Sequence, residues 1–253
     1  MSPRRILVVN DDGVHGQGLE PLMKALSRIG VVTAVVPDGE RSADSHSLTL
    51  HKPLRVLKAR RAGRGTVFMV NGSPAACTRL GVLEVLKGKV DCVVSGINRG
   101  YNLGQDVLYS GTVAAAMEGT LLGLPSFSVS LGSGRGRGWA AAADFARRLV
   151  LALSRRRLPP GVCLNANLPD LDARRLRGVR VTRLGERVYE KRVTLRRDPA
   201  GTPYFWLQGR QVLGVPAPGT DVEAVHEGFV SLTPLHPDNT HLPSLSILES
   251  WGL

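Results

Sequence analysis

Short apolar runs and segments of helical periodicity alternate along the first two thirds of the chain. Arg5–Asn10 is a short run rich in β-branched residues, which is typical of a strand buried on both faces. From Leu19 to Ile29, apolar residues recur at helical spacing, and Gly30 predicts the end of that helix. Val31–Val36 is the next strand-like run. A strand, a helix and a strand within about thirty residues are typical of a βαβ unit, which predicts parallel strands.

The same alternation continues to about residue 165 and predicts an α/β fold. Four further strands and three further helices are expected. The strands are Thr66–Val70, Val90–Ser95, Pro125–Leu131 and Val162–Asn165, and the helices are Pro74–Leu86, Gly111–Leu122 and Trp139–Leu153. Gly96–Ser110 is expected to be a loop. This order predicts a Rossmann-like, mostly parallel sheet with helices on both faces.

The pattern changes after about residue 175. Strand-like runs are separated by Gly and Pro turns, with no helical periodicity between them. These runs are Arg180–Arg183, Arg187–Leu195, Tyr204–Gln208 and Phe229–Leu232. We interpret residues 176–253 as antiparallel hairpins and a C-terminal segment joined to an α/β core of residues 1–175, in a single domain. Helices already cover both faces of the predicted sheet, so the apolar residues of the hairpins need another surface, which a second subunit would supply. Those residues are Val193, Phe205, Trp206 and Leu207.

The net charge of +12 is unevenly distributed. Residues 135–210 contain 18 basic and 6 acidic residues, whereas residues 211–253 contain 5 acidic residues and no Lys or Arg. A basic region of this kind attracts anions such as phosphates or nucleic acid. The alternative, which charge alone favours, is that these Arg-rich helix faces and hairpins are only solvated. Aromatic residues make up only 5% of the chain, and no aromatic RNA-binding stretch is present. Small anionic substrates are therefore favoured over specific nucleic-acid binding.

The apolar runs also bear on location. The longest of them, such as Leu149–Leu153, are too short to span a bilayer. The stretch after Met1 lacks the apolar length and the cleavage site of a secretory signal. We therefore expect a cytoplasmic protein with no membrane partner.

Three polar clusters follow predicted strands. They are Asn10–Gly13, Glu40–Ser47 and Gly96–Asn98. Ligands in open α/β sheets bind beyond the carboxyl ends of the strands, so the clusters are expected to meet. Asp11, Asp12, Ser42 and Asn98 would form an all-oxygen shell for one divalent cation. Such a shell favours Mg²⁺, Mn²⁺ or Ca²⁺ over zinc or copper.

A predicted helix begins at Tyr109-Ser110-Gly111-Thr112. Its first amide groups would favour a phosphate, with Ser110, Gly111 and Thr112 as the contacts. The alternative is that Ser110 or Thr112 simply caps the helix. No lysine follows in the Walker pattern, and Gly13, Gly16 and Gly18 do not fit the dinucleotide fingerprint.

The same motifs resemble the SurE family of survival-protein-E 5′/3′-nucleotidases. The resemblance rests on ILVVNDDGVHGQGL, VVPDGERSADSHSLTL, VVSGINRGYNLG, YSGTVAAAMEG, LNANLPD, GTDVEAV and GFVSLTPLHPD, which extend over nearly the whole chain. It implies one divalent ion, Mn²⁺ or Mg²⁺, on Asp11, Asp12, Ser42 and Asn98, and phosphate contacts at Asn98 and Ser110–Thr112. It also implies hydrolysis of 5′- and 3′-nucleoside monophosphates and, in some members, of short polyphosphate. Dimers or tetramers that exchange C-terminal segments are implied as well. Gly39-Glu40 stands where a basic and a polar residue are more usual in the family.

The sequence thus predicts a metal-dependent phosphomonoesterase of nucleoside monophosphates, with Asp11 and Asn98 as catalytic residues. Asp11 is either a general base or only a metal ligand. A catalytically silent nucleotide- or RNA-binding protein is the alternative, supported by the basic segment 135–210. A nicotinamide-dependent oxidoreductase fits the fold but lacks the glycine fingerprint.

Overall fold

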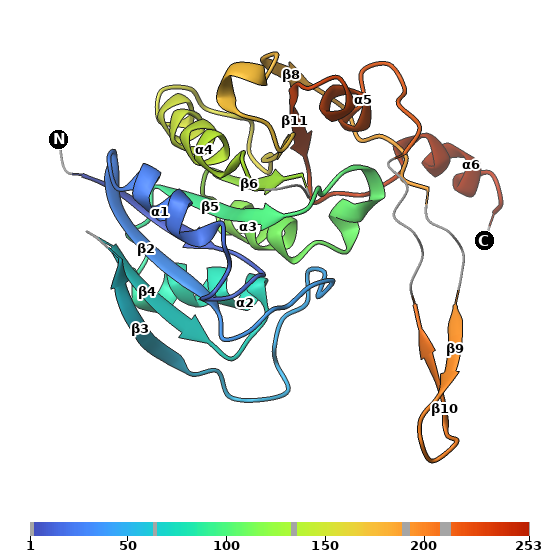
Figure 1. The fold of residues 1–253 in the computed structure, drawn as a ribbon. Helices are drawn as coiled ribbons and strands as arrows, with labels where there is room; N and C mark the ends of the chain where they lie inside the picture. Colours follow the sequence, from blue (N-terminus) through green and yellow to red (C-terminus); the bar gives the residue numbers. More distant parts are fainter. Residues whose placement is uncertain (1–2, 63–64, 133–135, 189–192, 208–213, 253) are drawn as a thin grey trace.

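The structure is a computed structural model that describes residues 3–62, 65–132, 136–188, 193–207 and 214–252. Within these described residues, a nine-stranded sheet forms the centre of the molecule, and a two-stranded hairpin lies apart from it (Figure 1). The strand order in the large sheet is β3-β4-β2-β1-β5-β6-β7-β11-β8. The strands are β1 (Arg4–Val9), β2 (Gly30–Pro37), β3 (Val56–Ala62), β4 (Gly65–Val70), β5 (Cys92–Arg99), β6 (Ser126–Leu131), β7 (Cys163–Leu168), β8 (Val179–Val181) and β11 (Val230–Leu235).

Strand pairing in the large sheet is mostly parallel. From β4 to β7 every neighbouring pair runs parallel. The connections β1–β2, β5–β6 and β6–β7 each contain a helix that the periodicity predicted, whereas the connection from β2 to β4 contains β3 instead of a helix. Antiparallel pairs occur at β3–β4 and at β7–β11. The helices are α1 (Leu19–Leu26), α2 (Pro74–Leu80), α3 (Gly111–Leu121), α4 (Trp139–Leu153), α5 (Asp221–His226) and α6 (Leu245–Glu249). The predicted α/β fold is confirmed.

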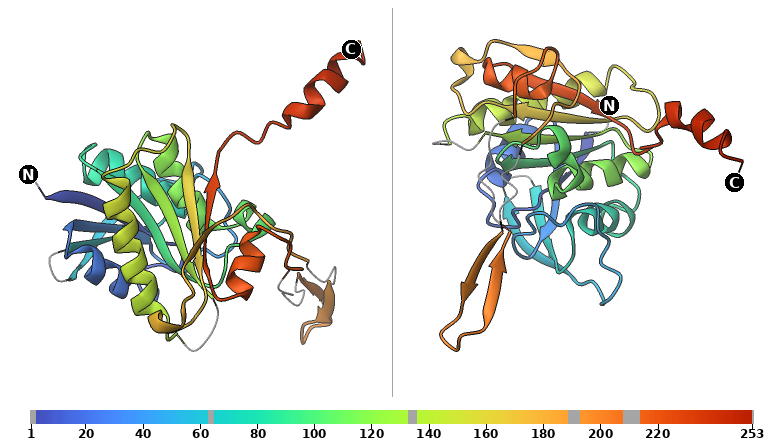
Figure 2. Two further views of the ribbon diagram at one scale, coloured as in Figure 1. Left: turned by 90° about the horizontal axis from the view of Figure 1, so that it is seen from above. Right: turned by 90° about the vertical axis from the view of Figure 1, so that its right-hand side faces the viewer.

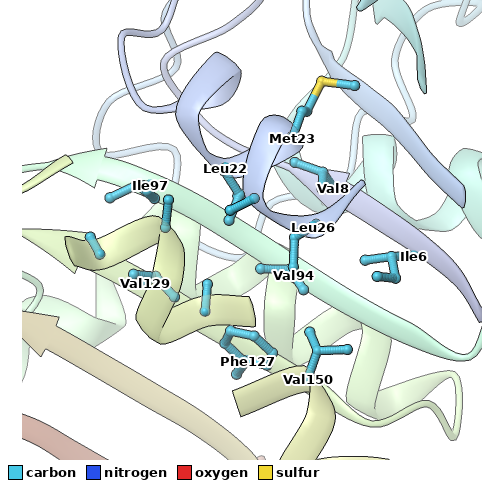
Figure 3. Packing of buried hydrophobic residues seen from close by; sticks show 14 of the residues in the cluster. Ile6, Val8, Leu22, Met23, Leu26, Val94, Ile97, Phe127, Val129 and Val150 are labelled. Atoms are coloured by element: carbon cyan, nitrogen blue, oxygen red, sulfur yellow. The ribbon is translucent and has the colours of Figure 1, made fainter. Parts of the chain in front are cut away.

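Helices cover both faces of the sheet, and alternate residues of a strand reach the two layers. Ile6 and Val8 of β1 pack with α1 and α4, in the cluster drawn in Figure 3. Leu7 and Val9 pack on the opposite face with residues of α2 and α3. A strand buried on both faces must be apolar at every position, which explains the unbroken apolar run of β1.

Several predicted boundaries were wrong. Helix α1 ends at Leu26, and Gly30 begins β2 instead of terminating the helix. A Cβ on Gly30 would lie 2.4 Å from the carbonyl oxygen of Arg4, so close approach to β1 explains this glycine. The predicted helix Pro74–Leu86 is divided into α2 and a π-helical turn, Gly81–Val85. Strand β3, which pairs with β4 at the sheet edge, was not predicted.

Where the structure describes the segment after residue 175, it contains one two-stranded hairpin instead of several. β11 and β8 join the large sheet beside β7. The hairpin consists of β9 (Thr194–Arg197) and β10 (Pro203–Trp206). The predicted strand Arg187–Leu195 overlaps β9 only at its end, and its residues 189–192 lie outside the described residues. Helices α5 and α6 were not predicted, because each is no longer than 6 residues and shows little periodicity.

The hairpin and the C-terminal segment both project from the body of the molecule. Figures 1 and 2 show β9–β10 extending away from the large sheet, and Figure 2 shows the C-terminal segment with α6 extending in another direction. No helix in the described ranges is long and apolar enough to cross a membrane.

Candidate active site

A pocket of about 690 Å³ opens beyond the carboxyl ends of the neighbouring strands β2, β1 and β5. Asp11, Asp12, Ser42 and Asn98, the four predicted metal ligands, all line it. Ser110, at the start of α3, lines it as well. Three polar clusters that lie far apart in the sequence therefore meet where the strand order predicted.

Asp11 lies two residues after the end of β1 and is 7% exposed. Its carboxylate accepts two hydrogen bonds from Thr112 in the first turn of α3. The amide of Thr112 donates to Oδ2 at 3.2 Å, and the hydroxyl donates to Oδ1. Burial raises the pKa of Asp11, and the hydrogen bonds from Thr112 oppose that rise. Thr112 thereby fixes the orientation of the Asp11 carboxylate.

Asp12 occupies a turn that its neighbours hold in shape. The side chain of Asn10 accepts a hydrogen bond from the amide of Gly13 at 3.2 Å and donates one to its carbonyl at 2.9 Å. Burial raises the pKa of Asp12 to about 6, with further contributions from the negative charges of Asp11 and Glu40. The turn therefore holds two carboxylates close enough to repel each other.

Asn98 lies in β5, not in the loop that the sequence predicted from residue 96 onward. The register with β6 shifts between Gly96 and Asn98, and such bulges re-aim side chains near binding sites. Gly96 has φ of 131°, and a Cβ there would lie 2.3 Å from the carbonyl oxygen of Val129, so no other residue fits. The side-chain nitrogen of Asn98 donates a hydrogen bond to the Gly100 carbonyl at 3.1 Å. The side-chain oxygen of Asn98 is therefore the atom that would coordinate a cation.

Ser42 belongs to a segment that crosses the pocket after β2. The amide of Arg41 donates to the carbonyl of Asp11 at 2.8 Å, which ties this segment to the first cluster. The Ser42 hydroxyl donates to Glu40 at 2.6 Å, so its oxygen lone pairs remain for other partners. The serine and the two aspartates are thus held on one side of the pocket by backbone contacts.

A buried glutamate anchors the far end of that segment. Glu118 of α3 is 2% exposed, and it accepts a hydrogen bond from Arg79 at 2.7 Å and contacts the ring nitrogen Nε2 of His46 at 3.0 Å. Burial alone would raise the pKa of Glu118, but the hydrogen bonds from His46 and Arg79 outweigh it and hold the pKa below its ordinary value. His46 does not line the pocket; it holds the segment in place.

At the start of α3, the sequence left two alternatives for Ser110 and Thr112: contact with a phosphate, or capping of the helix. Ser110 is the N-cap, since its side chain accepts from the amide of Val113 at 3.1 Å, and it also lines the pocket. Thr112 is fully buried and bonds to Asp11. Neither Gly111 nor Thr112 is among the described residues that line the pocket.

The wall opposite Ser42 rests on a buried amide network. The amide of Asn102 donates to the side chain of Asn167 at 2.8 Å, and its own side chain donates to Ser130 at 2.7 Å. Its carbonyl accepts from Asn165 at 2.8 Å and from Asn167 at 3.0 Å. Buried polar networks whose members are paired rigidify their surroundings, so these bonds fix the loop that follows Asn98.

The C-terminal part of the chain supports the same wall. Asp221, at the start of α5, accepts hydrogen bonds from the amides of Gly104 at 2.9 Å and Gly185 at 2.7 Å. Arg187 forms a buried ion pair with Asp106 at 3.0 Å, and Asp106 lines the pocket. Residues after 175 are therefore part of the structure that shapes the site.

Sequence reasoning assigned no role to several residues on the pocket wall, among them Glu40, Arg99 and Tyr109. Among the described residues that line the pocket, Arg99 is the one lysine or arginine. Its position directly after Asn98 was the available signal. Tyr109 directly precedes Ser110 and was quoted as part of the helix start, with no role assigned to it.

The donor set suits a hard cation. In the described parts of the chain, no three His, Cys, Asp or Glu side chains cluster so as to hold a metal ion. The predicted set is of a different kind, because it combines two carboxylates with a hydroxyl and an amide oxygen. A cation that prefers oxygen ligands fits these four residues, and its charge would offset the repulsion between Asp11 and Asp12.

Comparisons with known proteins show what the whole chain is similar to. The family model described as Survival protein SurE matches residues 6–191. The chain is 48% identical over 248 residues to a protein of Geobacter metallireducens named 5′-nucleotidase SurE, covering 98% of this chain and 97% of the relative. It is 47% identical over 239 residues to the 5′-nucleotidase SurE of Herpetosiphon aurantiacus, covering 94% of each.

A solved structure extends the agreement to three dimensions. The crystal structure of the SurE protein from Aquifex aeolicus superposes with a TM-score of 0.86 at 37% identity, over 98% of this chain and 100% of that one. Sequence and fold thus agree over nearly the full length, and the chain belongs to the SurE family.

Proposed function

We propose that the chain is a metal-dependent nucleotidase that hydrolyses nucleoside 5′-monophosphates to a nucleoside and phosphate. The observation that carries the proposal is the convergence of Asp11, Asp12, Ser42 and Asn98 on one pocket with the start of α3. Full-length similarity to proteins named 5′-nucleotidase SurE supports the same substrate class. Activity on 3′-monophosphates and on short polyphosphate, which the resemblance implies, belongs to the same proposal.

The metal site would consist of Asp11, Asp12, Ser42 and Asn98. A bound Mn²⁺ or Mg²⁺, with Ca²⁺ as an alternative, would supply positive charge for the phosphate oxygens and lower the pKa of a water molecule. The residues themselves orient the ligand oxygens. Thr112 fixes the Asp11 carboxylate, and the hydrogen bond from the Asn98 nitrogen to Gly100 restrains the side chain that would offer its oxygen to the cation.

The phosphate would lie between Asn98 and the start of α3. Thr112 and Val113 already donate their amides to Asp11 and Ser110, which makes the amide of Gly111 the first-turn donor for an anion. Arg99 adds a positive charge to a wall that otherwise carries several carboxylates. Asp11 then acts as a general base toward a water molecule, or as a ligand only.

A dimer or tetramer is the proposed form of the active protein. The large apolar side chains of the hairpin are solvent-exposed in the single chain, with Phe205 at 63% and Leu207 at 87%. Association would bury them at little conformational cost, because the hairpin is already formed.

Phosphate release from AMP tests the function. The assay is run with Mn²⁺, Mg²⁺ or Ca²⁺, with a chelator, and in parallel on 3′-AMP and tripolyphosphate. We expect release from AMP that requires a divalent cation and disappears with the chelator. Tight AMP binding without phosphate release under any metal would instead support the alternative of a catalytically silent nucleotide-binding protein.

A further inference from the structure

The pocket has an exposed aromatic side chain at its rim. Tyr109 lines the pocket and is 63% exposed. Tyr101, the other tyrosine on the wall, is half-buried, and burial raises its pKa to about 12. Most other side chains on the wall are polar or charged, so the exposed ring of Tyr109 offers a ligand an apolar surface there.

The backbone holds Tyr109 firmly although its ring is exposed. Its amide donates to the carbonyl of Asp106 at 3.0 Å, and its carbonyl accepts from the amide of Ser45 at 3.1 Å. The hydroxyl of Ser45 donates to the neighbouring Leu108 carbonyl at 2.6 Å. These bonds connect the segment that contains Ser42 to the turn that contains Tyr109. The backbone position from which the Tyr109 ring extends is therefore restrained.

The position of Tyr109 relative to the proposed phosphate site suggests its role. Tyr109 directly precedes Ser110, so its Cα lies about 3.8 Å from that of the α3 cap. A pocket of about 690 Å³ lies within the size range of sites that enclose a whole small-molecule ligand, which leaves room for more than a phosphate. A nucleotide whose phosphate sits at the start of α3 would place its base one sugar away, near the rim.

We propose that Tyr109 stacks on the base of the bound nucleotide and thereby provides the nucleoside subsite of this enzyme. The inference rests on the proposed function and adds the residue that recognises the base. Every base has a π-face, so stacking on a single tyrosine raises affinity for all four bases with little selection among them. The same contact is missing for a phosphate ester without a base.

A pair of substrates that differ only in the base tests this role. AMP and ribose 5-phosphate present the same 5′-phosphate ester, but only AMP has a ring to stack. Tyr109→Ala is expected to raise KM for AMP about 10-fold, the size of effect typical of one base–aromatic contact. The kcat for AMP and both constants for ribose 5-phosphate are expected to stay within about twofold of wild type. Tyr109→Trp, which keeps an aromatic face, should retain the low KM for AMP.

Leu108→Ala is the matched control. Leu108 is a neighbouring exposed residue at 57%, and it does not line the pocket. It should leave KM unchanged for both substrates. Equal changes in KM for AMP and ribose 5-phosphate, or no change in Tyr109→Ala, would overturn the stacking role while leaving the nucleotidase assignment intact.

A binding measurement separates this inference from the proposed function. Calorimetric titration of metal-free protein with AMP and with ribose 5-phosphate measures binding without turnover, because the proposed hydrolysis requires the cation. If wild type hydrolyses neither compound, the proposed function fails, and the two dissociation constants still decide the role of Tyr109. A loss of AMP affinity in Tyr109→Ala with ribose 5-phosphate unchanged supports the subsite, and equal affinities of wild type for both compounds contradict it.

Discussion

Around the pocket, polar side chains are buried and bonded to one another, whereas on the β9–β10 hairpin large apolar side chains face solvent. Asp11 and Glu118 are almost fully buried, and each has its carboxylate held by two contacts. Phe205 and Trp206 are consecutive residues of β10, so they point to opposite faces of the hairpin, yet they are 63% and 49% exposed. Within the described residues of one chain, neither face of the hairpin is covered.

This difference indicates that the pocket and the hairpin suit different kinds of partner. The pocket has fixed polar groups and two neighbouring carboxylates, so what it lacks is a small charged ligand. The hairpin has a formed backbone and exposed apolar surface, so what it lacks is another protein surface. Under the proposed function, the pocket would hold a cation and an anion, and the hairpin would form the contact with a second subunit.

The largest expected effect concerns the pocket. Asp12→Asn should lower kcat/KM for AMP by about 100-fold or more, the size found when a charge-stabilising group is removed from a transition state. The fold should persist, because Asp12 lies in a turn and the substitution removes repulsion with Asp11. Phosphate release and circular dichroism on the same sample check both statements. Near-normal turnover by a folded variant would remove Asp12 from the site.

The next effect concerns the hairpin. Wild type is expected to be a dimer or tetramer in light scattering at micromolar concentration. The double variant Phe205→Asp, Trp206→Asp should have a lower mass, because charges cannot be buried at an apolar contact without a partner. Leu50→Asp, at a residue that is 84% exposed outside the hairpin, is the control and should keep the wild-type mass. A monomeric wild type with full activity would refute the role given to the hairpin.

A smaller effect is expected from the contact behind Asp11. Thr112→Val removes the hydroxyl that bonds to Asp11 but keeps the amide, so the carboxylate loses one of its two anchors. We expect a loss of about 10-fold in kcat/KM and weaker Mn²⁺ binding, as for other groups that orient a metal ligand. Thr120→Val, the same replacement further along α3, should change neither. If the two variants behave alike, Thr112 is merely structural.

The smallest effect is on stability and depends on pH. Because the pKa of Glu118 is lowered in the fold, its ionised form contributes stability above its ordinary pKa of 4.5, and this contribution is lost as the pH falls below that value. Glu118→Gln should therefore unfold at lower denaturant concentration than wild type at pH 7, with the gap closing toward pH 4. Glu20→Gln, on the exposed side of α1, should show no gap at either pH. A gap that widens at low pH would contradict the assignment.

Much of the fold could be predicted from the sequence because its elements are long and periodic. The predicted helix Trp139–Leu153 is α4 with the same bounds, and the first βαβ unit is present as expected. The strands β8 and β11 were predicted as hairpin strands because three to six residues do not reveal their partner. Their place beside β7 is decided by tertiary pairing, which leaves no local pattern.

In the candidate site, too, some features could be predicted from local sequence patterns and others depend on tertiary contacts. Asp11, Asp12, Ser42 and Asn98 could be placed together because each follows a predicted strand end or is present in a family motif. The contacts that hold them could not be predicted. Thr112 was expected to bind phosphate, yet its hydroxyl and amide point to Asp11, and His46 pairs with a glutamate 72 positions away. Such pairings depend on how α3 packs against β1, which the sequence pattern does not encode.

The position of a bound Mn²⁺ ion tests the central claim most directly. Anomalous diffraction from a crystal grown with Mn²⁺ locates the ion without reference to activity. The account predicts one strong peak per chain in the pocket, coordinated by oxygens of Asp11, Asp12, Ser42 and Asn98. A peak at another place in the molecule, with this pocket free of Mn²⁺, would contradict it.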